Sequence, residues 1–287
     1  MSFRSRHPAH VRIFQVLAVG ALFVATLGAG TARAQIADIA PRISPIESML
    51  SLRAGTFEVW QDTTRLGTEF YSSYLTARRD TAAVSSLITY ELRSGRAKLH
   101  YEKHTLRLAS AMDNGLILYQ AHEDIGQQER GVAVTSYDTT ATIYHEADGK
   151  GAGNVIAIPH GRVYVLDASA YEQVEWLTRD FVESGLQTRN FHALIPPRDT
   201  VIDIQLSRGP KEKIQGPGGK ALSAQRVDIN DDMTKINVWM DDQGNLVRLE
   251  APAQKVRVVR LPPGDAEAQA MARAARPANP SGASARR

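Results

Sequence analysis

Short runs of alternating apolar and polar residues, separated by turn residues, occupy the sequence from residue 55 to residue 261. In the run Val201–Leu206 every second residue is Ile or Leu, so one side of an extended chain is apolar and the other is polar. About a dozen such runs follow one another at spacings of about 8–12 residues. This is too many strands for a flat sheet. We therefore predict an all-β domain over residues 55–261, built as a rolled antiparallel sheet that is barrel-like or a half-barrel.

One stretch inside this domain has the spacing of an amphipathic helix, which we place at residues 169–184. Its apolar stripe consists of Tyr171, Val174, Leu177 and Phe181. Ser169 and Glu172 match the capping-box pattern for the start of a helix, and Gly185 matches the pattern for its end. Because no second helix is predicted in the domain, the stripe must be buried against the sheet. We expect this accessory helix to form a lid or a plug.

The other face of the predicted helix is charged and contains one tryptophan. Its charged residues are Glu172, Glu175, Arg179, Asp180 and Glu183. Trp176 falls on this face, where it is either covered by a neighbouring loop or contacts a ligand or a partner. The predicted ligand-binding residues are therefore Tyr171, Val174, Trp176, Leu177 and Phe181.

The two ends of the chain differ in composition from the middle. Residues 1–34 combine arginines, an apolar run and Ala-Arg-Ala before Gln35, which is the pattern of a secretory signal peptide. Residues 35–54 are predicted to be a lead-in with a short helix, and residues 262–287 a disordered C-terminal tail. We thus expect an exported protein, in the periplasm or outside the cell, with no transmembrane segment after signal cleavage.

Composition excludes some classes of function. The chain has no cysteine, so disulfides and thiolate chemistry are excluded. Four of the 34 basic residues and none of the 31 acidic residues lie within residues 1–34, so the remaining chain is close to neutral. A neutral chain has no electrostatic reason to bind nucleic acid. No cofactor is expected.

A candidate metal site lies in the segment His100-Tyr101-Glu102-Lys103-His104. In a strand, His100, Glu102 and His104 share one face, and two imidazoles with a carboxylate are a plausible Zn²⁺ set. However, the two imidazoles would lie about 13 Å apart along the strand, so a solvated sheet face is the competing interpretation. His122 would lie near this face if the next strand forms a hairpin with this one.

The hairpin segment Ile236–Asp242 (Ile-Asn-Val-Trp-Met-Asp-Asp) is followed after Gly244 by Asn245–Glu250 (Asn-Leu-Val-Arg-Leu-Glu). This segment resembles the C-terminal hairpin of uncharacterised exported, periplasmic β-rich proteins of unknown function. The predicted plan, a rolled antiparallel sheet with a helix at its opening, is also similar in architecture to the outer-membrane lipoprotein carriers. That second resemblance implies a cavity that could shelter an acyl chain.

Three functions remain open at this point. The first is a non-enzymatic binding or carrier protein for an apolar or amphiphilic molecule of the envelope, such as a lipid. The second is a metal-dependent hydrolase that uses His100, Glu102 and His104. The third is a structural partner of another envelope protein. The chain contains neither the G-x-S-x-G nor the H-E-x-x-H motif, so no catalytic residue is assigned and a non-enzymatic role is favoured.

Overall fold

The structure is a computed structural model that describes residues 50–75, 80–94, 97–110, 113, 115–126, 128–230 and 235–264. The expected signal peptide, residues 35–49 of the expected lead-in and residues 265–287 of the expected tail lie outside the described residues. The remaining lead-in residues already belong to the first strand, which begins at Leu50.

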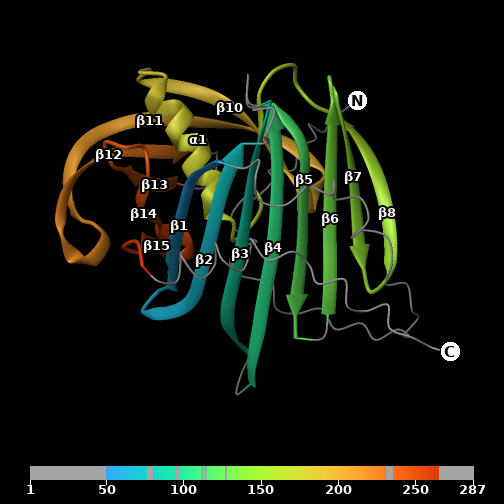
Figure 1. The fold of residues 1–287 in the computed structure, drawn as a ribbon, viewed down its shortest axis with the longest axis horizontal. Coiled ribbons are helices and arrows are strands. Elements are labelled where there is room, and N and C mark those ends of the chain that lie inside the picture. The colour runs from blue at the N-terminus through green and yellow to red at the C-terminus, as the bar shows by residue number, and fades with distance from the viewer. Residues whose placement is uncertain are drawn as a thin grey trace, which may run out of the picture.

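The described chain forms one sheet of 15 strands and one α-helix (Figure 1). The strands of the first half are β1 (Leu50–Gln61), β2 (Thr64–Leu75), β3 (Thr81–Ser94), β4 (Ala97–Ser110), β5 (Leu116–Ile125), β6 (Gln128–Tyr137), β7 (Thr140–Ala147) and β8 (Lys150–Ala157). Those of the second half are β9 (Val163–Val165), β10 (Thr188–Ile195), β11 (Thr200–Gln215), β12 (Ala221–Asn230), β13 (Lys235–Met240), β14 (Leu246–Ala251) and β15 (Val256–Arg260). The predicted all-β class with one accessory helix is confirmed.

The order of the strands joins the two ends of the domain. Strands β8 to β1 follow one another across the sheet, and β1 then pairs antiparallel with β15, which continues back through β14 to β9. The described neighbours are antiparallel, with the exception of β9 and β10, which run parallel. The alternating pattern predicted the strands and hairpins, but this parallel pair was not expected.

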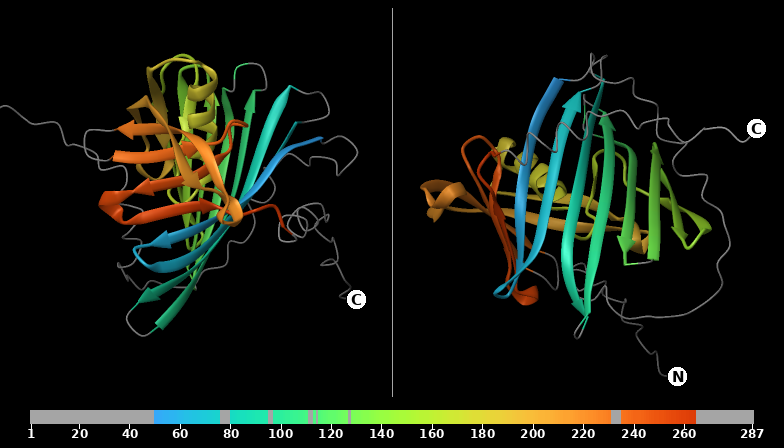
Figure 2. Two further views of the ribbon diagram at one scale, coloured as in Figure 1. Left: turned by 90° about the vertical axis from the view of Figure 1, so that its left-hand side faces the viewer. Right: turned by 60° about the horizontal axis from the view of Figure 1, so that its bottom comes forward.

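The sheet rolls up until one end packs on its own inner face (Figure 2). Val163 and Val165 of β9 and Leu194 of β10 join a buried apolar cluster with inward residues of β5, β6 and β7. A polar contact supports the same closure, because Nε2 of His145 on β7 lies 2.6 Å from Oδ1 of Asp199 in the turn after β10. The roll therefore encloses an interior that both halves of the sheet line.

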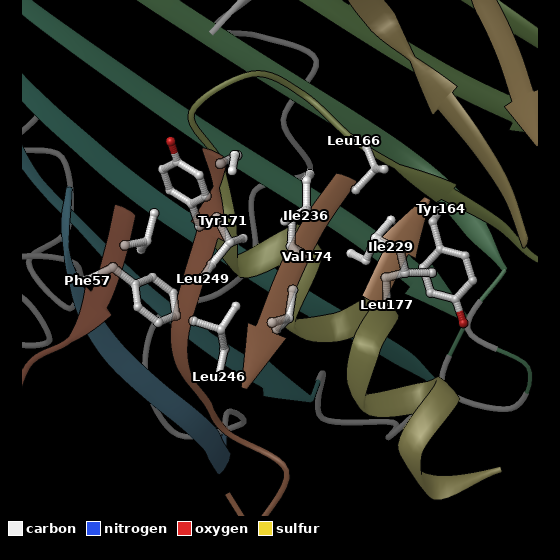
Figure 3. Close-up of a cluster of buried hydrophobic side chains, with 14 of the residues drawn as sticks. Phe57, Tyr164, Leu166, Tyr171, Val174, Leu177, Ile229, Ile236, Leu246 and Leu249 are labelled. Carbon is white, nitrogen blue, oxygen red and sulfur yellow. The ribbon is translucent and has the colours of Figure 1, made fainter. Parts of the chain in front are cut away.

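Helix α1 (Tyr171–Glu183) lies in this interior, where Figure 3 shows its apolar side chains against those of the sheet. The predicted stripe is buried in the main core, which includes Phe57 of β1, Ile236 of β13 and Leu249 of β14. As predicted, Gly185 adopts a left-handed conformation after the helix, with a φ of 72°. The predicted capping box is wrong, because the helix begins after Ala170 and no side chain of the cap position bonds to it. Ser169 instead has a φ of 74°.

Candidate functional site

The charged face of the helix does not face water, as the polar side of an amphipathic helix ordinarily does. Glu172, Glu175 and Arg179 are buried, while Asp180 is partly buried and only Glu183 is exposed. The physical reason is the roll of the sheet, which surrounds the helix instead of covering one side of it. Buried charges are costly unless they are paired or hydrogen-bonded, so each must have a partner from the strands or lose its charge.

Glu69 of β2 and Glu172 form a buried pair of carboxyl groups at the start of the helix. The backbone N–H groups of Tyr171 and Glu172 donate to the two oxygens of Glu69, with N···O distances of 2.7 and 3.2 Å. The carboxyl group of Glu172 lies close enough to that of Glu69 for the two groups to interact electrostatically. Burial raises the pKa of both groups, and the facing Glu172 raises that of Glu69 further. Two adjacent buried carboxyl groups cannot both ionise cheaply, so the pair holds a proton.

A second buried set fixes the segment that leads into the helix. Nζ of Lys103 lies 2.8 Å from Oδ2 of Asp167 and 2.8 Å from Oε1 of Glu123. The hydroxyl of Tyr119 donates to the same Asp167 oxygen at 2.5 Å. Burial lowers the pKa of Lys103, but Asp167 and its other neighbours outweigh this and raise it, so the lysine is a cation. This ion pair ties β4 and β5 to the residues just before α1.

A third set holds the middle of the helix. The carboxylate of Glu175 accepts hydrogen bonds from the hydroxyl of Tyr71 at 2.7 Å, from Arg260 at 2.8 Å and from the backbone N–H of Leu246 at 3.1 Å. Arg179, one turn later, also donates to it. Burial raises the pKa of Tyr71, and the adjacent Glu175 raises it further, so this tyrosine stays neutral. These bonds join the helix to β2, β14 and β15.

Trp176 lies between two guanidinium groups. The guanidinium carbon of Arg179 is 5.0 Å from the centre of a Trp176 ring, and that of Arg107 is 5.9 Å away. The ring is half-buried against the main core. Its indole Nε1 is buried, and no group of the described residues is placed to accept a hydrogen bond from it.

The other two tryptophans satisfy their indole groups. Nε1 of Trp60 donates to Glu58 at 3.0 Å, and Nε1 of Trp239 donates to Glu212 at 2.9 Å. A buried indole N–H usually has an acceptor. Trp176 is therefore the exception, and an unpaired donor beside two cations is suited to an acceptor oxygen, above all an anionic one.

The other predicted binding residues lie where the stripe meets the sheet. Tyr171 and Val174 are almost fully buried, and Leu177 and Phe181 are 0% exposed. Phe181 packs edge-on against Phe191 of β10 with ring centres 6.3 Å apart. The stripe and Trp176 thus belong to one continuous region of α1, but the stripe is packed on protein side chains.

His100, Glu102 and His104 lie on the outer face of β4, on one side of the strand as expected; the two histidines are exposed and Glu102 is half-buried. Nε2 of His104 is 2.7 Å from Oε1 of Glu102, whereas Nε2 of His100 is 3.7 Å from Oε2. In the part of the chain that the structure describes, no three His, Asp or Glu side chains are arranged to hold a metal ion. The expected hairpin partner is confirmed, since His122 of β5 lies directly opposite His104.

Sequence reasoning missed the buried polar residues Glu69, Lys103 and Asp167. A signal for two of them was present in the alternation of the strands. Glu69 is two residues from the inward Tyr71, and Lys103 is two residues from the inward Tyr101. A charged residue at an inward position indicates a buried partner, which is a stronger sign of a special site than a charge on an outer face.

Comparisons with known proteins leave the family open. No family model matches this chain, and no curated protein matches it. One solved structure with some similarity is that of a β-barrel-like protein of a domain of unknown function, DUF1849, from Brucella abortus. It is 10% identical, with a TM-score of 0.49, over 72% of this chain and 94% of that chain. A similarity at this level does not establish a common fold, so the fold class rests on the strands of this chain. No helix of the described residues is long and apolar enough to cross a membrane.

Proposed function

We propose that this protein is an exported, non-enzymatic binding protein for an amphiphile with an acidic head group, such as a fatty acid. The observation that supports this most is the buried, unpaired indole N–H of Trp176 beside the guanidinium groups of Arg107 and Arg179. A carboxylate or phosphate oxygen would accept this hydrogen bond and would be attracted by both cations.

The apolar part of the ligand would lie along the helix stripe. Leu177 follows Trp176 on α1 but is fully buried, so the apolar part of a molecule anchored at the indole would have to displace side chains that now pack on the stripe. Two further polar atoms near the start of the helix support a polar group in this region. Oδ1 of Asp167 and Oε2 of Glu172 are buried, and the described residues supply no hydrogen-bond donor to either. A hydroxyl of the head group would satisfy such acceptors.

The location of the ligand follows from the expected export of the chain. The signal-peptide pattern of residues 1–34 supports the envelope, with the periplasm favoured over the outside of the cell. Lipids and their breakdown products are the amphiphiles available there.

Titration of the delipidated protein with a fluorescent fatty acid tests the proposal. We expect saturable binding by the wild type. Trp176→Phe keeps the aromatic packing but removes the N–H, and a lost hydrogen bond to a charged group of about 1.5–3 kcal/mol weakens binding by about tenfold or more. Trp60→Phe is the matched control, because the indole of Trp60 already has its acceptor.

Thermal melts of both variants show whether the fold is intact, so that a loss of binding can be assigned to the indole. The absence of saturable binding by the wild type would refute the proposal. That outcome would leave the docking of an envelope protein as the better alternative. Equal binding by wild type and Trp176→Phe would refute the role of the indole and would mean that the fatty acid binds elsewhere on the protein.

A further inference from the structure

Two histidines face each other across neighbouring strands on the outer surface of the roll. His104 of β4 and His122 of β5 are directly opposite in the antiparallel register, and Glu102 and Asp124 form the next outward pair. The two imidazoles are 56% and 47% exposed, and Glu102 and Asp124 are half-buried. Two imidazoles and two carboxylates thus occupy a compact block on two strands.

Two histidines opposite each other on neighbouring strands are close enough to bind one metal ion, whereas His100 and His104 along β4 are not. Directly opposite residues in an antiparallel pair have Cβ atoms about 4.5–5.5 Å apart. Two imidazole nitrogens that bind one tetrahedral Zn²⁺ at about 2.0–2.1 Å are separated by about 3.3 Å, which such a pair can reach. His100 and His104 are separated by four residues of one strand, a distance of about 13 Å, and cannot do so.

The carboxylates already lie against the nitrogens that would bind the metal. Nε2 of His104 is 2.7 Å from Oε1 of Glu102, and Nε2 of His122 is 3.4 Å from Oδ1 of Asp124. Glu102, Asp124 and Glu129 also lie directly opposite one another across β4, β5 and β6. Like charges at opposite positions are destabilising, and a bound cation would relieve this repulsion.

We propose that His104 and His122 form the imidazole pair of a surface site for a divalent transition-metal ion such as Zn²⁺, with Glu102 and Asp124 as its carboxylates. In their present positions the side chains do not converge on one point. The ion would therefore have to draw the imidazoles of His104 and His122 together, away from the carboxylates that they now contact. Imidazole and carboxylate are ligands that favour Zn²⁺ over Mg²⁺.

Calorimetric titration of the full, tag-free chain with zinc chloride tests this site. We expect saturable binding of one ion, no such binding of Mg²⁺, and a loss of about tenfold or more in zinc affinity in His104→Ala and in His122→Ala. His100→Ala is the matched control, since it lies on the same strand and face but has no imidazole opposite it. Its affinity should equal that of the wild type.

The outcomes separate the alternatives. Loss of affinity in both His104→Ala and His122→Ala, with His100→Ala unchanged, supports the site. Loss in His100→Ala and His104→Ala with no effect of His122→Ala would overturn it in favour of the set along one strand. No saturable zinc binding by the wild type would overturn both. Circular dichroism melts without metal check that these surface changes leave the fold intact.

Discussion

Replacing Glu172 by glutamine should change how the stability of this protein depends on pH. Glu172 and Glu69 are buried, interact with each other electrostatically and lie at the start of α1. The folded protein therefore keeps a proton on the pair at pH values where both groups are ionised in the unfolded chain. Glutamine has a similar shape and its amide can donate a hydrogen bond to Glu69, but it has no titratable proton.

The sign and size of the effect follow from this extra proton. Burial raises the pKa of both carboxyl groups above their ordinary value of 4.5. The stability contributed by the proton is complete below this value and is lost as the pH rises through the raised pKa of the folded state. Within that window the folded state binds one proton more than the unfolded state, so the free energy of unfolding falls by about 1.4 kcal/mol per pH unit.

In Glu172→Gln this slope should become smaller and should begin at lower pH. The repulsion from the Glu172 carboxylate is removed and the N–H groups of residues 171 and 172 still donate to Glu69, but the burial of Glu69, which is the larger cause of its raised pKa, remains. Burial keeps Tyr90 and Tyr171 neutral by raising their pKa. Asp167 and Arg107, the nearby charges, are the same in both proteins.

Urea unfolding followed by circular dichroism between pH 5 and pH 9 measures the effect. As the pH rises, the free energy of unfolding of the variant should increase relative to that of the wild type. Glu183→Gln changes the exposed last residue of α1 and is the control. Its free energy of unfolding should depend on pH in the same way as that of the wild type. Parallel profiles for Glu172→Gln and the wild type would refute the shared proton.

Two further predictions concern the core. Val238→Asp, at a fully buried position of β13, should destabilise the fold by on the order of 4 kcal/mol in thermal melts, whereas Asn237→Asp on the other face should cost far less. Lys103→Ala leaves the buried Asp167 without its cation and should cost about 3–5 kcal/mol. Adding Asp167→Asn should restore much of the lost free energy of unfolding. A double variant as unstable as Lys103→Ala would contradict the ion pair.

The strands and their inward faces could be predicted because they depend on local periodicity. In Val201–Leu206 the expected apolar side contains Ile204 and Leu206, which are 2% and 0% exposed. The expected hairpin after it is present as β13 and β14, with Val238 opposite Leu249. Alternation identifies the faces of a strand, but it contains no information on the pairing of β1 with β15, which joins residues about 200 positions apart.

The edge strand β8 contains a glycine-rich segment whose sequence does not indicate a strand. The glycine-rich segment 149–153 is the kind of sequence expected in a flexible loop, and yet Lys150–Ala157 pairs with β7. Gly151 is explained by a close approach, since a Cβ atom at this position would lie 1.6 Å from the hydroxyl oxygen of Tyr144. The ring of Tyr144 thus lies over a strand position that has no side chain of its own.

The burial of the charged helix face could not be predicted, because the partners are distant in sequence. Glu69 and Glu172 are 103 residues apart, and Tyr71 and Glu175 are 104 residues apart. Helical periodicity separates an apolar side from a polar side, and the polar side is assigned to water by default. This default fails here because the sheet surrounds the helix and supplies partners for its charges from β2, β14 and β15.

The polar contacts also explain why Trp176 has a defined environment. An apolar stripe alone would let a helix slide or rotate inside a rolled sheet, because apolar contacts have no direction. Glu69 fixes the start of α1 through two backbone N–H groups, and Glu175 fixes its middle through bonds to Tyr71 and Leu246. Two fixed points set both the position and the rotation of the helix. The indole N–H is consequently held beside Arg107 and Arg179, which is the preorganisation that a binding site for an acidic head group requires.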